Sequence, residues 1–426
     1  MMPDKTAFEG AAVQDGPPSN LCADPVHRQW LLDQALELFR FFQPNVINPA
    51  GGFYALAQDG TPLACQGQAG LTQHLHSTTR MVHCFALGQV LGIVGADAVI
   101  DHGMAHIWNR HRDAQQGGYF WGVDNETVTE PTKQAYGHAF VLLAASAAKR
   151  AGHPDADRML ADIREILETR FWEAEIGASQ EDFSADWQPL APYRGQNSNM
   201  HLTEALMAAF QATGDSTYLG MADRIADLII NRHARAADWR VPEHFDATWS
   251  VDYAYSGNLM FRPAGLTPGH ALEWSRLLVD LYKLGKKKHV WMPAAAEALF
   301  VKACQLGWNE TLGGFHYTLD WDNRPLQTCC LWWPCAEAIA AAHCLQSVSD
   351  NPTFVLWYRR VWAFVDAHFI DKTYGGWFPE LNPQRQPVSE IFVGKPDLYH
   401  AVQACLIPLG DNPMSDQKRV WQADPP

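Results

Sequence analysis

The sequence lacks a long apolar run, and this absence excludes the simplest membrane architecture. No stretch of about 18 apolar residues occurs in it, whereas a transmembrane helix needs roughly 20. Residues 1–20 are polar and contain glycine and proline in place of the apolar core of a signal peptide. We therefore expect a cytoplasmic protein whose residues 1–25 form a disordered tail.

Positive charge is also scarce. Lysine and arginine together number 32 against 47 aspartates and glutamates, which leaves a net charge of −15. A surface this acidic repels nucleic acid and anionic bilayers, so we expect neither among the partners. A small neutral ligand suits this charge better, and a hydrophobic content of 47% is enough to fill a large core.

Cysteine pairs at metal-binding spacing are missing as well. The nine cysteines are scattered, and Cys329, Cys330 and Cys335 form the only cluster. A zinc site needs a further pair of ligands at a fixed spacing, which this cluster lacks. An odd, scattered set is typical of reduced, buried thiols. The sequence therefore predicts no metal and no other cofactor.

What the sequence does contain is an internal repeat, a Gly-Gly-aromatic triplet that follows a helical pattern and leads into a turn. Clear copies stand at residues 51–53, 117–119, 313–315 and 375–377. A degenerate copy lies at Gly177, and adjacent copies are about 60 to 66 residues apart. The gap from Gly177 to Gly313 is about twice as long, which predicts a sixth copy at residues 238–250. Each copy is expected to form a short β-hairpin.

Each repeat unit contains two helical patterns, the second more apolar than the first. The first helices should begin near residues 27, 96, 154, 215, 291 and 352, and the second near 78, 133, 199, 268, 332 and 396. Six pairs with the apolar set inside predict an all-α fold, an (α/α)6 toroid with short β-hairpins at one mouth. We expect one domain over residues 26–412 and a tail over 413–426. The alternative is an open helical solenoid.

Histidines gather where the second helices are expected to begin. His201, His270 and His400 lie in the first turn of the third, fourth and sixth of these helices, and His138 lies deeper in the second. The positive end of a helix dipole disfavours imidazolium, so these rings should stay neutral and able to accept a proton near pH 7. One such histidine would more often be structural, but three at equivalent positions indicate a catalytic site.

Other residues at these helix starts suit a sugar ligand. Arg80, Asn197 and Glu273 offer groups for sugar hydroxyls. Trp333, one of 17 tryptophans, stands at the fifth start and is followed by Glu337. Aromatic faces stack on the C–H face of a pyranose, although core packing explains more than half of the tryptophans.

Motifs around these residues resemble the N-acylglucosamine 2-epimerase superfamily. The resemblance is carried by residues 193–201, 241–246, 262–274 and 397–400, extends from about Arg28 to Pro408, and looks closest to the aldose–ketose isomerase branch. It implies an (α/α)6 barrel, no metal, and catalytic histidines at His270 and His400. The sugar contacts that it implies are Arg80, Asn197, His201, Glu273 and Trp333. Arg262, from the longest motif, and Glu337 complete the candidates for substrate binding.

We expect this chain to interconvert mannose and fructose through a cis-enediolate, with lyxose–xylulose interconversion as a side activity. His400 would carry the proton between C2 and C1. His270, positioned by Glu273, would open the sugar ring and exchange the O1 and O5 protons, and the two roles could be reversed. Arg80 and His201 would stabilise the oxyanion.

Four alternatives stay open. A 2-epimerase acting on N-acylglucosamine or cellobiose would return the proton to the opposite face of C2. A sulfoquinovose isomerase would need extra donors near C6, where Pro379 and Pro396 offer no N–H and Lys395 and Arg385 lie nearby. A glycoside hydrolase would use a pair of glutamates. A toroid that only binds sugar or protein would not need the histidines. The sequence determines neither the oligomeric state nor the direction of flux.

Overall fold

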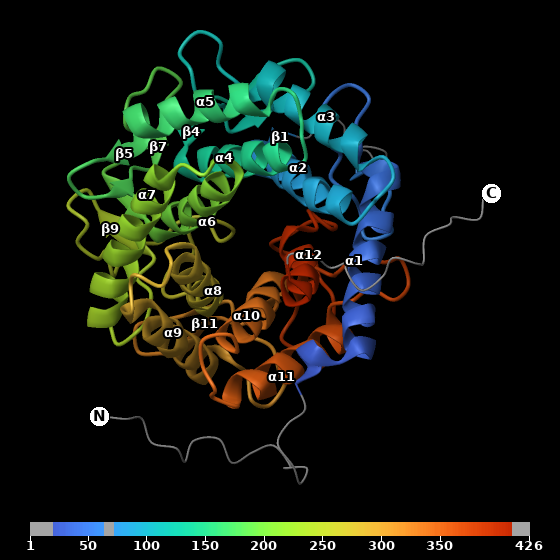
Figure 1. The fold of residues 1–426 in the computed structure, drawn as a ribbon, viewed down its shortest axis with the longest axis vertical. Helices are drawn as coiled ribbons and strands as arrows, with labels where there is room; N and C mark the ends of the chain where they lie inside the picture. Colours follow the sequence, from blue (N-terminus) through green and yellow to red (C-terminus); the bar gives the residue numbers. More distant parts are fainter. Residues whose placement is uncertain (1–19, 64–71, 411–426) are drawn as a thin grey trace.

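The computed structural model describes residues 20–63 and 72–410, and twelve α-helices in this part of the chain form two concentric layers (Figure 1). The outer helices are α1 (Pro25–Val46), α3 (Ala96–His106), α5 (Ala156–Ile166), α7 (Ser216–Ala226), α9 (Trp291–Gly307) and α11 (Thr353–His368). The inner helices are α2 (Leu75–Val90), α4 (Ala135–Arg150), α6 (Gln196–Thr213), α8 (Pro268–Leu284), α10 (Trp332–Leu345) and α12 (Tyr399–Leu406). The last inner helix, α12, packs against α1 and α2, so the ring is closed. The predicted (α/α)6 toroid is confirmed, and the open solenoid is wrong.

The inner helices are buried on nearly every side, as their apolar sequences predict. In α4 the run from Ala139 to Ala145 is at most 2% exposed. The outer helices are amphipathic, and in α5 the buried residues Met159, Leu160 and Ile163 share one face at helical spacing. Among the described helices, none combines the length and apolarity needed to cross a bilayer.

Short antiparallel strand pairs cap the mouth at which the inner helices begin. The strands are β1 (Gln73–His74), β2 (Gly122–Val123), β3 (Val128–Glu130), β4 (Lys133–Gln134), β5 (Trp172–Glu173), β6 (Ala178–Ser179), β7 (Asp182–Phe183), β8 (Tyr193–Gly195), β9 (His244–Asp246), β10 (Thr318–Leu319), β11 (Pro325–Gln327), β12 (Cys330–Leu331) and β13 (Glu380–Leu381). Strands β1, β4, β8 and β12 each end where an inner helix begins, and they pair with β2, β7, β9 and β13 of the following unit. These pairs fix the starts of the inner helices relative to one another.

The repeated glycine pairs adopt a left-handed backbone, which explains the repeat. Gly117 and Gly118 have φ of 72° and 77°, and a Cβ on Gly118 would lie 2.6 Å from the Trp187 ring. In the predicted sixth copy Asp238 and Trp239 take the glycine positions, with φ of 55° and 63°. The sixth copy at residues 238–250 is therefore present, at the strain that non-glycine residues have in this region.

Helical structure begins before the predicted domain boundary. Leu21–Ala23 form a 3-10 turn in which Cys22 is buried, and the Asp24 side chain caps α1. The tail predicted over residues 1–25 therefore includes ordered residues from 20 onward. Residues 1–19 and the tail predicted over 413–426 lie outside the described residues.

Two inner helices begin three residues earlier than the sequence suggested, and two begin later. Helices α2 and α6 start at Leu75 and Gln196, against predictions near 78 and 199, whereas α4 and α12 start at Ala135 and Tyr399, against 133 and 396. The hydroxyl residues near the predicted start lie inside α2: Thr79 Oγ1 donates to the carbonyl of Leu75 at 2.8 Å. This shift moves His76 and Asn197 into the second position of their helices.

Candidate active site

A cavity of about 270 Å³ opens where the inner helices begin. The second or third residue of every inner helix lines it: His76, Tyr136, Asn197, His270, Trp333 and His400. Arg80, His201 and Glu273 lie one helical turn deeper and line it too. The volume is close to the lower end of the roughly 300–1,000 Å³ common for small-molecule sites, which favours one sugar ring over two.

His270 is held by a buried carboxylate from the preceding hairpin. Its Nδ1 lies 2.8 Å from Glu243 Oε2, and the same carboxylate accepts hydrogen bonds from Gln196 Nε2 at 2.7 Å and from the backbone N–H of Thr267 at 3.2 Å. Burial opposes ionisation of Glu243, but its interactions with His270 outweigh burial and lower the pKa of Glu243. An ionised Glu243 keeps the proton on Nδ1, which makes Nε2 the basic nitrogen. The prediction that Glu273 positions His270 is wrong, because Glu243 does so.

His400 has an equivalent carboxylate partner. Its Nδ1 lies 2.8 Å from Glu337 Oε1, and the other Glu337 oxygen accepts from Arg276 Nε at 3.0 Å. Burial opposes ionisation of Glu337, but the charge of Arg276 and the contact with His400 outweigh it and lower its pKa. Glu337 is 1% exposed and is not among the residues that line the cavity, so it contacts His400 from behind.

The two imidazoles flank one indole. The Trp333 ring centroid lies 5.1 Å from that of His270 and 5.8 Å from that of His400. Two histidines, each with a carboxylate near Nδ1, thus line one small cavity beside the same aromatic ring. This arrangement places two groups capable of acid–base chemistry next to one bound ligand.

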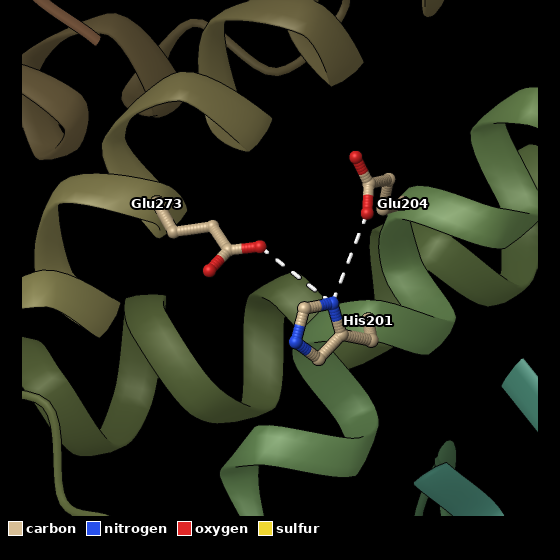
Figure 2. A group of neighbouring side chains, drawn as sticks. All are labelled: His201, Glu204 and Glu273. Carbon is tan, nitrogen blue, oxygen red and sulfur yellow. Dashed lines mark ion pairs between the residues drawn. The ribbon is translucent and has the colours of Figure 1, made fainter. Parts of the chain in front are cut away.

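One helical turn deeper, His201, Glu204 and Glu273 form an acidic cluster (Figure 2). The carboxyl groups of this cluster do not all have the same charge. His201 Nδ1 lies 3.6 Å from Glu273 Oε1 and 3.8 Å from Glu204 Oε2. Burial and repulsion by Glu337 raise the pKa of Glu273 well above its ordinary value, and neither of its oxygens has a hydrogen-bond partner. Burial also lowers the pKa of His201 to about 4. Both shifts favour the uncharged forms, the carboxylic acid of Glu273 and the neutral imidazole of His201.

Arginine supplies the positive charge of this cluster. Arg276 lies 3.3 Å from a Glu204 oxygen, 3.8 Å from Glu273 and 3.0 Å from Glu337. Two overlapping groups, His201 with Glu204 and Glu273, and Glu273 with Glu337 and His400, bring enough ligand atoms together to hold a cation. The buried guanidinium of Arg276 offsets part of the negative charge of these carboxylates.

Two arginines predicted to bind substrate are placed differently. Arg80 lines the cavity. Its guanidinium donates hydrogen bonds to Asp397 Oδ2 at 3.0 Å and to the Tyr136 hydroxyl at 2.9 Å. Arg262 is not among the residues lining the cavity; it pairs with Asp182 and lies over the ring of Tyr193. Arg262 thus anchors the segment that brings Met260 and Phe261 into the cavity wall.

Asn197 contacts the same segment, since its Nδ2 donates to the carbonyl of Phe261 at 3.1 Å. His138, by contrast, has a structural role: its Nε2 accepts from the backbone N–H of Tyr119. Of the cysteine cluster, Cys330 and Cys335 are buried, and burial raises the pKa of Cys329 to about 12, as expected for inert thiols.

Sequence reasoning missed four residues of the site. They are His76, Tyr136, Glu243 and Asp397. Glu243 and Asp397 lie in motifs that carried the family resemblance, without a role being assigned to them. His76 has the same offset from its helix start as His400, a signal that the misplaced start of α2 concealed.

Comparison with known proteins agrees with this geometry. The family profile described as N-acylglucosamine 2-epimerase (GlcNAc 2-epimerase) matches residues 51–404. A D-mannose isomerase of Pseudomonas cannabina pv. alisalensis is 41% identical over 92% of this chain and 94% of the relative, and one of Thermobifida fusca is 41% identical over 91% and 95%. A crystal structure of a D-mannose isomerase is 33% identical, with a TM-score of 0.84 over 89% of this chain and 97% of that one. The chain therefore belongs to the N-acylglucosamine 2-epimerase family.

Proposed function

We propose that this chain is a metal-independent aldose–ketose isomerase that interconverts D-mannose and D-fructose. The observation that carries the proposal is the pair of histidines, His270 and His400, each with a carboxylate on Nδ1, which line one cavity beside Trp333. The two 41% identical relatives named D-mannose isomerase support the choice of substrate.

The reaction moves one carbon-bound proton. A base takes the proton from C2 of the open-chain aldose, and the same group returns it to C1 of the cis-enediolate, while the proton of the C2 hydroxyl is transferred to O1 and leaves a carbonyl at C2. We assign this proton to His400 and ring opening to His270, because an imidazole can both take up and release a proton near neutral pH. Arg80 stabilises the oxyanion, and the protonated Glu273 donates a hydrogen bond to a sugar oxygen.

A neutral hexose fits the charges around the cavity better than a sulfonated one. Lys395 is 1% exposed and its Nζ bonds to Asp371 Oδ2 and to the carbonyl of Gln58. Arg385 donates to the carbonyl of Gly313 through Nε at 2.9 Å. Both cations that could have held a sulfonate are thus engaged elsewhere.

Product identification tests the proposal. The purified protein is incubated with mannose, glucose, N-acetylmannosamine, cellobiose and sulfoquinovose, and products are followed by NMR. We expect fructose from mannose. Glucose as the main product would indicate 2-epimerisation, and a tenfold preference for sulfoquinovose, about 1.4 kcal/mol in transition-state binding, would refute the assigned substrate.

A further inference from the structure

The ring of inner helices divides the cavity into two halves. The inner helices follow one another around the ring in the order α2, α4, α6, α8, α10 and α12 (Figure 1). His270, Trp333 and His400 come from the consecutive helices α8, α10 and α12. In the proposed mechanism the reacting carbons lie beside these three side chains, with Arg80 one turn deeper in α2. The other end of the sugar is therefore placed beside the first-turn residues of the second half, which is made by α2, α4 and α6.

His76 lies in that second half, and the assigned mechanism gives it no role. It is the second residue of α2, in the position that His400 has in α12, and it lines the cavity with its neighbour Ser77. Its ring is stacked on Trp121 at 5.0 Å between centroids and 14° between planes, and Phe261 packs edge-on at 5.3 Å. The aromatic contacts fix the plane of the imidazole, and the residue is only 8% exposed.

The polar atoms of His76 have few partners, as do Asn197 Oδ1 and His201 Nδ1 in the same half. The Nδ1 of His76 has no hydrogen-bond partner, and its Nε2 has only the Ser77 hydroxyl, at 3.3 Å. The Tyr136 hydroxyl, in contrast, accepts from Arg80, and the Asn197 amide donates to the main chain. Burial lowers the pKa of His76 well below its ordinary value, and a neutral imidazole offers one donor and one acceptor, which suits a hydroxyl group.

We propose that His76, together with Ser77, binds the hydroxymethyl group at the end of the hexose remote from the reacting carbons, and so determines specificity for hexoses over pentoses. The inference rests on the proposed function, because it places C1 and C2 beside His270 and His400. It assigns His76 a binding role outside the proton transfers.

The test compares mannose with lyxose, which has the same configuration at C2 to C4 and no hydroxymethyl group. His76→Phe retains an aromatic ring against Trp121 and removes both ring nitrogens. Loss of one hydrogen bond should lower kcat/KM for mannose by about three- to tenfold while that for lyxose changes by less than about twofold. His102→Ala is the control, because His102 lies in the outer helix α3 and its Nε2 forms a hydrogen bond with the carbonyl of Gly52. With this variant, kcat/KM for both sugars should match the wild-type values.

Three outcomes would overturn the inference. An equal loss on both sugars would place His76 at the reacting end or in the scaffold, and an unchanged kcat/KM for both sugars would remove it from binding. A variant whose loss on lyxose exceeds that on mannose would reverse the assigned orientation of the sugar. Wild-type protein that makes no ketose from either sugar would instead refute the proposed function, whatever the variant does.

Discussion

Replacing Glu243 by glutamine tests the assignment of His270 most sharply. Glu243 accepts three hydrogen bonds, and the amide of Gln196 is itself oriented because its Oε1 accepts from Trp274 Nε1 at 2.7 Å. A glutamine at position 243 keeps the shape of the side chain but can no longer accept with both terminal atoms. Its amide would face Nδ1 of His270 and favour the tautomer that carries the proton on Nε2, which leaves the cavity side without a base.

The expected loss follows from that change of tautomer. A positioned general acid–base group contributes about 10²–10⁴-fold, or roughly 3–5 kcal/mol of transition-state stabilisation. Glu243→Gln should therefore lower kcat by at least about 10²-fold, approaching His270→Ala. Because the carboxylate acts through the imidazole, the double variant should lose little beyond His270→Ala alone.

The assay is initial-rate ketose formation from mannose, with the fold checked by circular dichroism and thermal unfolding. Asp162→Asn serves as a control, since Asp162 binds Arg112 at 2.9 Å and the Tyr119 hydroxyl at 2.8 Å in the outer layer; it should lower Tm and leave kcat/KM near the wild-type value. Near-wild-type turnover of Glu243→Gln, or losses that add in the double variant, would refute a role for Glu243 in orienting His270.

Three further predictions concern the acidic cluster. Arg276→Met leaves buried carboxylates without their cation and should cost about 3–5 kcal/mol of stability, measured by urea unfolding; a change below about 1 kcal/mol would contradict its role in charge balance. Isomerase activity should survive exhaustive dialysis against EDTA, and a loss that zinc, manganese or cobalt restores would contradict metal independence. His201 has its pKa lowered from 6.5 to about 4 by burial, so the unfolded state binds more protons between these values and stability should fall as pH falls through this window, by up to about 3 kcal/mol. His201→Gln should flatten that part of the urea-stability profile, and an unchanged slope would show that other groups cause it.

The ring could be predicted from the sequence because its hairpins need backbone conformations that few residues adopt. Paired glycines at a left-handed φ mark four of the copies, and their spacing gives the number of units. The copy at Asp238 and Trp239 uses the same conformation without glycine, so only the arithmetic of the spacing indicated it. Family membership, the closed toroid and the burial of the inner helices were all predicted correctly.

The starts of the inner helices were less predictable, because they depend on pairing between units. Strand β1 pairs with β2 of the next unit, and this contact ends the extended backbone at His74. Nothing local to residues 73–80 shows that pairing, and the run of hydroxyls around Thr79 imitates a cap. The three-residue error concealed His76, although the step of four residues from His76 to Arg80 is the same as that from Asn197 to His201.

The partner of His270 was assigned wrongly for a related reason. Glu273 lies three residues further along the same helix, which made it the obvious partner, but its carboxyl group lies in the acidic cluster beside His201. Glu243 is separated from His270 by 27 positions and reaches it through the hairpin that ends in β9. A sequence shows neighbours along a helix directly, whereas neighbours across a loop emerge only from the fold.

The carboxyl groups of Glu273 and Glu337 have pKa values shifted in opposite directions, and this difference affects the proposed proton transfer. In the proposed mechanism His400 is positive while it holds the substrate proton, and the Glu337 carboxylate, 2.8 Å from Nδ1, would stabilise that charge. The enediolate that forms at the same moment is negative, so an ionised Glu273 at the cavity would oppose it. Burial and the nearby Glu337 raise the pKa of Glu273 and so favour its protonated form, and a carboxylic acid can donate a hydrogen bond to the developing oxyanion. Glu337 thus has two effects in this proposed mechanism. Its carboxylate stabilises the protonated His400, and its negative charge raises the pKa of Glu273 and favours the neutral acid.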